Sequence, residues 1–257
     1  MRRIIAGVLA AALTACSEPA ERPGQAPAGN GGVAADALDR PAANGVPADA
    51  AAGPEPRPPA PAAGTVAAER VILFVGTSLT AGYGIGADRA YPAVLQAKID
   101  SAGLPFRVTN AGISGETSAG GLRRIDWALQ QPVDVLVLEL GANDGLRGLD
   151  PGQLERNLEA IIERTRAAHP DAGIVLLGME APPNLGSAYT TRFRNAYRDV
   201  ARRNDVHLIP FLLEGVAGVP ALNQPDGLHP TAEGQQRMAE TVWRTLAPLL
   251  EARVRSP

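Results

Sequence analysis

From residue 69 onward, the chain alternates short apolar runs with longer segments whose apolar residues recur at helical spacing. The runs predict strands at 71–75, 106–110, 133–140, 173–178 and 206–211, and the periodic segments predict helices at 91–102, 117–130, 150–169, 187–203 and 231–254. Strands separated by helices form a parallel sheet that is covered on both faces. We therefore predict an α/β fold, a doubly wound three-layer α/β/α sandwich whose five-stranded parallel sheet has the flavodoxin-like order 2-1-3-4-5.

The predicted sheet brings distant polar residues to one edge. In a doubly wound sheet, ligands bind beyond the carboxyl ends of the strands, where the winding reverses between the first and third strands. Ser78 follows the first predicted strand, Gly115 the second and Asn143 the third. We therefore expect these three residues on one rim, facing the late loop that contains Asp226 and His229.

These residue types suit acyl transfer. Serine can act as a nucleophile, asparagine as an oxyanion donor, and an Asp-x-x-His pair as a general base with its orienting group. Among the three histidines, His169 lies at a helix end, where it can cap carbonyl groups, and His207 lies within a strand. Only His229 is placed to reach the rim, and an imidazole with the usual pKa of about 6.5 can take a serine proton at neutral pH.

Each segment also has a purely structural interpretation. Ser78 could cap a helix, and Asp226-Gly227 could form a turn that leaves His229 in solvent. The sequence around Ser78 is not the Gly-x-Ser-x-Gly elbow of the common α/β-hydrolases, because Leu79-Thr80 follow the serine. The presence of all the segments in order along one chain favours a hydrolase.

Four blocks of the sequence resemble those of the SGNH (GDSL) hydrolases, in the family's order: residues 76–79 (GTSL), 112–118 (GISGETS), 141–148 (GANDGLRG) and 226–230 (DGLHP). The most similar subgroup is the bacterial periplasmic multifunctional thioesterase, arylesterase and lysophospholipase. The resemblance implies that Ser78 is the nucleophile, His229 the base and Asp226 its partner. It also implies an oxyanion hole made of the backbone N–H groups of Ser78 and Gly115 and the side-chain amide of Asn143.

The chain departs from the family's pattern at Thr77, where Asp usually follows the first glycine. That Asp is not a triad member and commonly holds the loops by hydrogen bonds. A threonine hydroxyl can do part of this, so we expect activity to survive. Asp144 is expected to orient its loop rather than to act as a second acid.

Two loops on the rim are candidates for a substrate groove. Leu146 flanks Asn143, and Pro182 lies in the apolar, proline-containing segment 179–186. We expect no metal and no cofactor, because the sequence contains no His/Cys/Asp cluster with ligand spacing and no phosphate-binding glycine loop. Nucleic-acid binding has no electrostatic support, because the net charge is −3 and no basic run follows Arg3.

The N-terminal region has a different character. A basic start precedes an apolar run at 4–13 that is too short to span a bilayer. The following Leu13-Thr14-Ala15-Cys16 is similar to the lipobox of a bacterial lipoprotein signal. We therefore expect a signal peptide at 1–15 and lipid on Cys16; an ordinary cleaved signal with an incidental cysteine is the alternative. Cys16 is the only cysteine, so an internal disulfide is excluded.

The segment 16–68 is rich in Ala, Pro and Gly and lacks apolar periodicity, which predicts a disordered tether for a hydrolase domain at 69–257. We expect a monomeric lipoprotein of the cell envelope that faces the periplasm. Ser17 in place of Asp after the cysteine favours the outer membrane, by a sorting rule of enteric bacteria.

The expected function is a serine esterase or thioesterase acting on the carboxylic ester or thioester bonds of small acyl substrates. Two alternatives stay open: an O-acetylesterase for carbohydrate or peptidoglycan, and a non-catalytic envelope lipoprotein that binds a ligand through this fold. The complete set of Ser, Gly, Asn, Asp and His argues against the second. The apolar loop after the fourth strand favours lipid-like acyl groups over acetyl groups.

Overall fold

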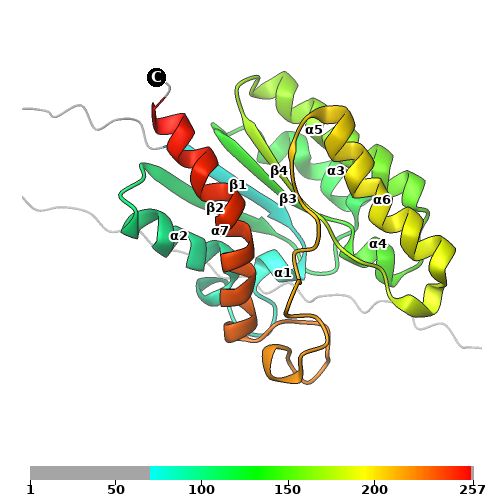
Figure 1. Cartoon of the computed structure of the whole chain (residues 1–257). Coiled ribbons are helices and arrows are strands. Elements are labelled where there is room, and N and C mark those ends of the chain that lie inside the picture. Colours follow the sequence, from blue (N-terminus) through cyan, green and yellow to red (C-terminus); the bar gives the residue numbers. More distant parts are fainter. Residues whose placement is uncertain (1–69, 256–257) are drawn as a thin grey trace, which may run out of the picture. The chain divides into compact units, whose positions relative to one another are not determined.

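The computed structural model describes residues 70–255, which form a three-layer α/β/α sandwich (Figure 1). The sheet consists of β1 (Arg70–Gly76), β2 (Phe106–Gly112), β3 (Val135–Glu139), β4 (Gly173–Leu177) and β5 (His207–Ile209). Its order is β2-β1-β3-β4-β5 and every pairing is parallel, which confirms the predicted sheet. The expected signal peptide at 1–15 and tether at 16–68, including Cys16, lie outside the described residues.

The long helices divide between the two faces of the sheet (Figure 1). One face carries α2 (Tyr91–Ser101) and α7 (Ala232–Arg255), and the other carries α3 (Ser118–Ala128), α5 (Pro151–Ala168) and α6 (Ser187–Asn204). The short elements are α1 (Ser78–Ala81), α4 (Ala142–Leu146) and the 3₁₀ turns η1 (Ala87–Arg89), η2 (Pro183–Leu185) and η3 (Pro220–Leu222). None of the helices within 70–255 has the length and apolar character needed to cross a membrane.

Local chemistry sets several element boundaries. Asp150 caps α5, because its carboxylate accepts a hydrogen bond from the Gly152 N–H at 3.2 Å, and Pro151 occupies the first helical position. β5 is shorter than the predicted strand at 206–211, because Pro210 follows Ile209 and has no N–H to donate to the ladder. The short helices α1 and α4 were not predicted, because they contain too few residues to show a helical period.

The strands β1, β2 and β3 end at the same level. Gly76 pairs with Gly112 of β2 on one side and with Glu139 of β3 on the other. β1 and β3 are almost entirely buried between the helical layers, so their ends form a fixed edge. The loops that carry the predicted site residues after the first three strands all leave from this edge.

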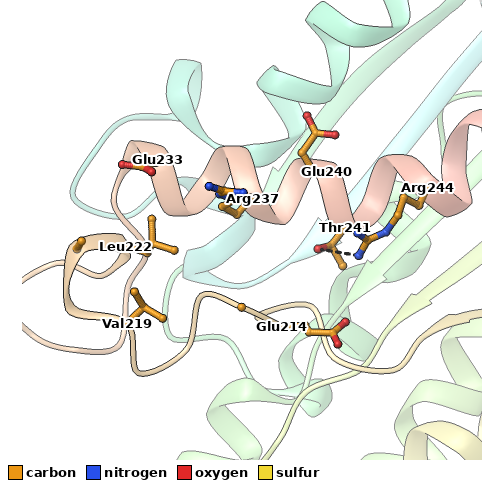
Figure 2. Close-up of a pocket in the computed structure, with 10 residues that line it drawn as sticks. Glu214, Val219, Leu222, Glu233, Arg237, Glu240, Thr241 and Arg244 are labelled. Carbon is orange, nitrogen blue, oxygen red and sulfur yellow. Dashed lines mark hydrogen bonds between the residues drawn. The ribbon is translucent and has the colours of Figure 1, made fainter.

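A groove of about 560 Å³ lies between α7 and the loop after β5 (Figure 2). Its lining carries charges of both signs, from Glu214, Glu233, Arg237, Glu240 and Arg244. None of the predicted site residues lines it. The groove is therefore separate from the edge of the sheet that the sequence indicated.

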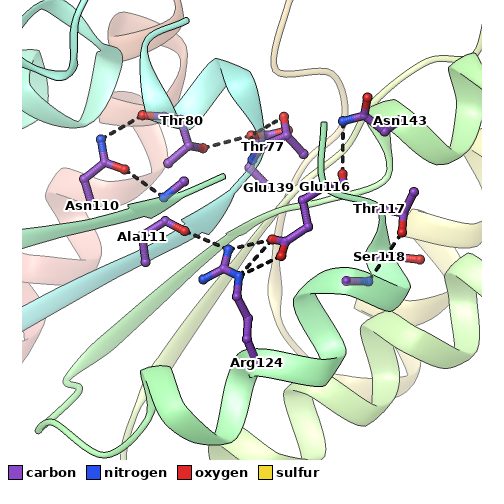
Figure 3. Close-up of polar contacts among 12 residues, drawn as sticks. Thr77, Thr80, Asn110, Ala111, Glu116, Thr117, Ser118, Arg124, Glu139 and Asn143 are labelled. Carbon is purple, nitrogen blue, oxygen red and sulfur yellow. Dashed lines mark hydrogen bonds and ion pairs between the residues drawn. The ribbon is translucent and has the colours of Figure 1, made fainter. Parts of the chain in front are cut away.

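The last residue of β3, Glu139, is a fully buried carboxyl group at that edge. The Thr77 N–H donates to its Oε2 at 2.8 Å, Thr77 Oγ1 lies 3.0 Å from both of its oxygens, and Thr80 Oγ1 donates to Oε2 at 2.8 Å (Figure 3). These bonds tie β3 to the turn that contains Ser78. Burial raises the pKa of Glu139 from 4.5 to about 7, although the hydrogen bonds from Thr77 and Thr80 act in the opposite direction.

The free energy of unfolding of Glu139→Gln, relative to that of the wild type, should increase as the pH rises. A carboxyl group whose pKa is higher in the folded than in the unfolded chain binds its proton more tightly when folded, so the free energy of unfolding falls as the pH increases. For Glu139 the fall extends from pH 4.5 to about 7 and amounts to about 3 kcal/mol, whereas glutamine cannot ionise.

Urea unfolding of the wild type and of Glu139→Gln, between about pH 4 and 8, measures this effect. The free energy of unfolding of the variant minus that of the wild type should increase from pH 4.5 to about 7 and should then stay constant. A difference that does not depend on pH would contradict the buried-acid interpretation.

Candidate active site

Ser78 is the first residue of α1, just beyond the end of β1. Glycines allow this helix to sit against the strand ends: a Cβ on Gly76 would lie 2.0 Å from Thr80 Oγ1, and one on Gly112 would lie 2.4 Å from the backbone of α1. Thr77, not Ser78, occupies the N-cap position of α1. Helix capping therefore does not account for Ser78, whose side chain stays partly exposed on the rim.

A histidine and a carboxylate from the loop before α7 complete a chain of hydrogen bonds to Ser78. His229 Nε2 lies 3.0 Å from Ser78 Oγ, and His229 Nδ1 lies 2.7 Å from Asp226 Oδ2. An ionised carboxylate can only accept, so Nδ1 carries the proton and the Nε2 lone pair faces the serine hydroxyl. The Tyr83 ring packs beside the imidazole with 4.4 Å between the ring centres. This geometry allows a proton to move from Ser78 to His229.

Asp226 is fixed by its own turn. Its Oδ1 accepts the backbone N–H groups of Leu228 at 2.9 Å and of His229 at 3.0 Å, and Gly227 has a φ of +69°. The hydrogen bonds from the His229 backbone and side chain, followed by that from Leu228, lower the pKa of Asp226 from 3.8 to about 2. The turn that the sequence allowed as an alternative does form, and it directs His229 toward Ser78.

The side chain of Asn143 contacts the loop after β2, which also contains Gly115, another predicted oxyanion donor. Asn143 is in the first turn of α4, and its Nδ2 donates to the Glu116 carbonyl oxygen at 3.0 Å. Gly115 immediately precedes Glu116 and has a φ of +78°, in the region that favours glycine. Within residues 70–255, the second N–H of the Asn143 amide makes no hydrogen bond, so it can serve a substrate oxygen.

Asp144 supports this loop, as expected. It is buried and accepts the Ser118 N–H at 2.8 Å and the Ser118 hydroxyl at 2.6 Å. Asn157 of α5 donates to the same hydroxyl at 2.8 Å. The start of α3 is thereby held against α4, the helix that carries Asn143.

The remaining histidines lie elsewhere. His169 Nε2 is 3.0 Å from the Leu129 carbonyl oxygen at the end of α3, so the carbonyl that it contacts belongs to a neighbouring helix and not to its own helix, α5. His207 is exposed on β5, at the edge of the sheet. No group of His, Cys, Asp and Glu side chains in the described part of the chain could hold a metal ion.

The two groove candidates lie on adjoining loops. Leu146 is 49% exposed at the end of α4, and Pro182 is partly exposed just before η2. A Cβ on Gly145 would lie 3.5 Å from the Ala181 Cα, so the residues next to the candidates lie close together. The two candidates therefore lie on neighbouring loops of the rim.

Sequence reasoning did not identify Glu139, Glu116 or Arg124. An acid at the end of the apolar run 133–140 was an available signal for the first, because unpaired acids are rarely fully buried. Glu139 is also the partner of Thr77, whose N–H and hydroxyl both donate to it, so the threonine holds this turn by hydrogen bonds. The ion pair between Glu116 and Arg124 forms only in the folded chain, and no periodic pattern in the sequence indicates it.

The chain is similar in sequence to several known proteins. Residues 74–237 match the sequence profile of the GDSL-like Lipase/Acylhydrolase family. The chain is 44% identical to Esterase TesA of Pseudomonas aeruginosa over 185 residues, which covers 72% of this chain and 91% of that protein. It is 40% identical to Thioesterase 1/protease 1/lysophospholipase L1 of Escherichia coli K12 over 186 residues, which covers 72% of this chain and 86% of that protein.

A solved structure has the same fold. The psychrotrophic esterase EstA from Pseudoalteromonas sp., in a form inhibited by monoethylphosphonate, superposes with a TM-score of 0.67 at 34% identity and covers 71% of this chain and 99% of that one. The profile match, the identities and the structural similarity confirm the family that the four sequence blocks indicated. The chain therefore belongs to the GDSL-like lipase/acylhydrolase family and is an ester-hydrolysing enzyme.

Proposed function

We propose that the protein is a serine esterase and thioesterase that hydrolyses carboxylic ester or thioester bonds of acyl substrates. The observation that carries this proposal is the connected chain from Asp226 through His229 to Ser78, with contacts of 2.7 Å and 3.0 Å. The similar esterase and the similar thioesterase and lysophospholipase support the same bond types.

In the proposed first half-reaction, Ser78 Oγ attacks the acyl carbon while His229 Nε2 accepts the hydroxyl proton. Asp226 stays ionised and stabilises the imidazolium that forms. The negative oxygen of the tetrahedral intermediate accepts hydrogen bonds from the Ser78 and Gly115 N–H groups and from the Asn143 amide. When the bond to the leaving group breaks, His229 returns its proton to the alcohol or thiol.

The second half-reaction repeats these steps with water. His229 takes a proton from a water molecule that attacks the acyl-Ser78 ester, and the same donors hold the new oxyanion. Collapse of this intermediate releases the carboxylic acid, and the proton on His229 returns to Ser78. The products are one acid and one alcohol or thiol, and no cofactor enters the reaction.

Substitution of the proposed nucleophile should abolish hydrolysis. Ser78→Ala should reduce the hydrolysis of p-nitrophenyl butyrate by the purified protein to the background rate, because no acyl-enzyme can form. Asn143→Ala should lower kcat by about 100- to 1,000-fold, because one oxyanion donor is lost, and the protein should stay folded with only a small fall in its unfolding midpoint, because one hydrogen bond to Glu116 is also lost. Ser101→Ala, in α2 away from the rim, is the control and should keep wild-type activity. Hydrolysis that survives in Ser78→Ala would contradict the proposed role.

Substitutions at the rim should change the preference for acyl length. We propose that Leu146 and Pro182 flank the acyl chain, because they are solvent-accessible and lie on adjoining loops. Leu146→Ala and Pro182→Ala should lower kcat/KM more for octanoate than for acetate p-nitrophenyl esters, because longer chains bury more apolar surface. Val254→Ala, an exposed apolar position near the end of α7, is the control.

An unchanged ratio of kcat/KM between octanoate and acetate in both rim variants would remove these residues from the acyl site. A wild-type enzyme that hydrolyses acetate esters only would instead indicate the O-acetylesterase alternative.

We also propose that the mature chain is held at the periplasmic side of the cell envelope by lipid on Cys16. The support is the basic start, the short apolar run and the single cysteine at the expected cleavage site. In a bacterial host, the full-length wild type should therefore fractionate with membranes, and Cys16→Ser should appear in the soluble fraction with its esterase activity intact. Equal membrane association of both proteins would argue for another anchor, and release of both into the soluble fraction would argue for an ordinary cleaved signal.

A further inference from the structure

The backbone carbonyl of Glu116 is the hydrogen-bond partner of the Asn143 amide, so whatever fixes this carbonyl also fixes that donor. The Glu116 carboxylate is held by Arg124 of α3, whose Nε lies 2.8 Å from Oε1 and whose second nitrogen lies 2.6 Å from Oε2 (Figure 3). The side chains are only 9% and 16% exposed, respectively. The same guanidinium donates to the Ala111 carbonyl oxygen of β2 at 2.7 Å, which ties the loop to the sheet.

The surroundings are shaped for this ion pair. A Cβ on Gly120 of α3 would lie 2.6 Å from Glu116 Cγ, so glycine allows the glutamate side chain to pass along the helix. On the other side of the loop, Arg147 donates to the Gly115 carbonyl oxygen at 3.0 Å. The peptide groups around Gly115 and Glu116 are thus held from two directions.

The position of the Glu116 carbonyl matters because the side-chain amide of Asn143 can rotate by half a turn, which exchanges its oxygen and its NH₂ group. The two ends of the Asn143 amide have almost the same shape, but only the NH₂ end can donate to an oxyanion. A carbonyl oxygen opposite the NH₂ group selects this orientation, because the reversed amide would bring two acceptor oxygens together. Loss of the carbonyl's position would leave the amide free to present its oxygen to the substrate.

We propose that the Glu116–Arg124 ion pair is a positioning pair of the oxyanion hole, which acts through the Glu116 carbonyl on the Asn143 amide. This inference rests on the proposed function. Neither side chain touches the substrate. Their effect is on the stabilisation of the transition state, in which the oxyanion develops, and not on the binding of the neutral ester.

Arg124→Lys tests the proposal, because a lysine ammonium cannot bind both oxygens of Glu116 in parallel and also reach the Ala111 carbonyl. With p-nitrophenyl butyrate as substrate, kcat should fall about 10-fold with little change in KM, a smaller loss than the 100- to 1,000-fold typical of losing a whole donor. Arg203→Lys is the matched control, because Arg203 pairs with Glu155 and Glu159 on the exposed side of α5 and α6.

The decisive comparison is the same substitution in the Asn143→Ala protein. If Arg124 acts through the amide, Arg124→Lys should change kcat less than about 2-fold once the amide is absent. An equal loss in both backgrounds, or an unchanged kcat in the single variant, would overturn the proposal. Ser78→Ala measures the background rate, and full activity of Ser78→Ala or Asn143→Ala would instead overturn the proposed function.

Glu116→Gln keeps the backbone carbonyl and can still accept from Arg124, but it loses the charge. It should show a smaller fall in kcat that also disappears in the Asn143→Ala background. This variant carries the test if Arg124→Lys proves to be unfolded by circular dichroism. A fall in kcat caused by Glu116→Gln that persists in the Asn143→Ala protein would count against the positioning role.

Discussion

The parallel pairing of β1 with both β2 and β3 is the constraint on which the site depends. Because Gly76 pairs with Gly112 and with Glu139, three loops leave the sheet at one level, and residues far apart in the sequence become neighbours. A one-residue slip in either ladder would turn the strand's side chains to the opposite face. A slip in the β1–β3 ladder would also separate the Ser78 turn from Glu139, the carboxyl group that holds it.

Behind the proposed catalytic residues, other polar groups hold the loops in place. Glu139 binds the Ser78 turn through Thr77 and Thr80, and burial of this acid destabilises its ionised form. Buried ion pairs such as Glu116 with Arg124 add little net stability, because desolvation offsets their attraction. Such groups instead hold the loops in one geometry, and a site that stabilises a developing oxyanion requires donors in fixed positions.

The sequence predicted the features that depend on long periodic segments or on recognisable local chemistry. It predicted the strand order, the bounds of α5 to within one residue at each end and the approach of Ser78 to His229. It did not predict α1 or α4, which are too short to be periodic, or the early end of β5 at Pro210. It also did not predict the ion pair between Glu116 and Arg124, because that pairing depends on the path of the loop after β2.

The most direct test of the central claim is covalent labelling of the proposed nucleophile. Incubation with a p-nitrophenyl alkylphosphonate should release one p-nitrophenolate per chain and leave one phosphonyl group, which peptide mass spectrometry should locate on Ser78. Because His229 must take the serine proton, His229→Ala should label far more slowly. A label on another residue, or full hydrolytic activity after Ser78 is blocked, would contradict the account.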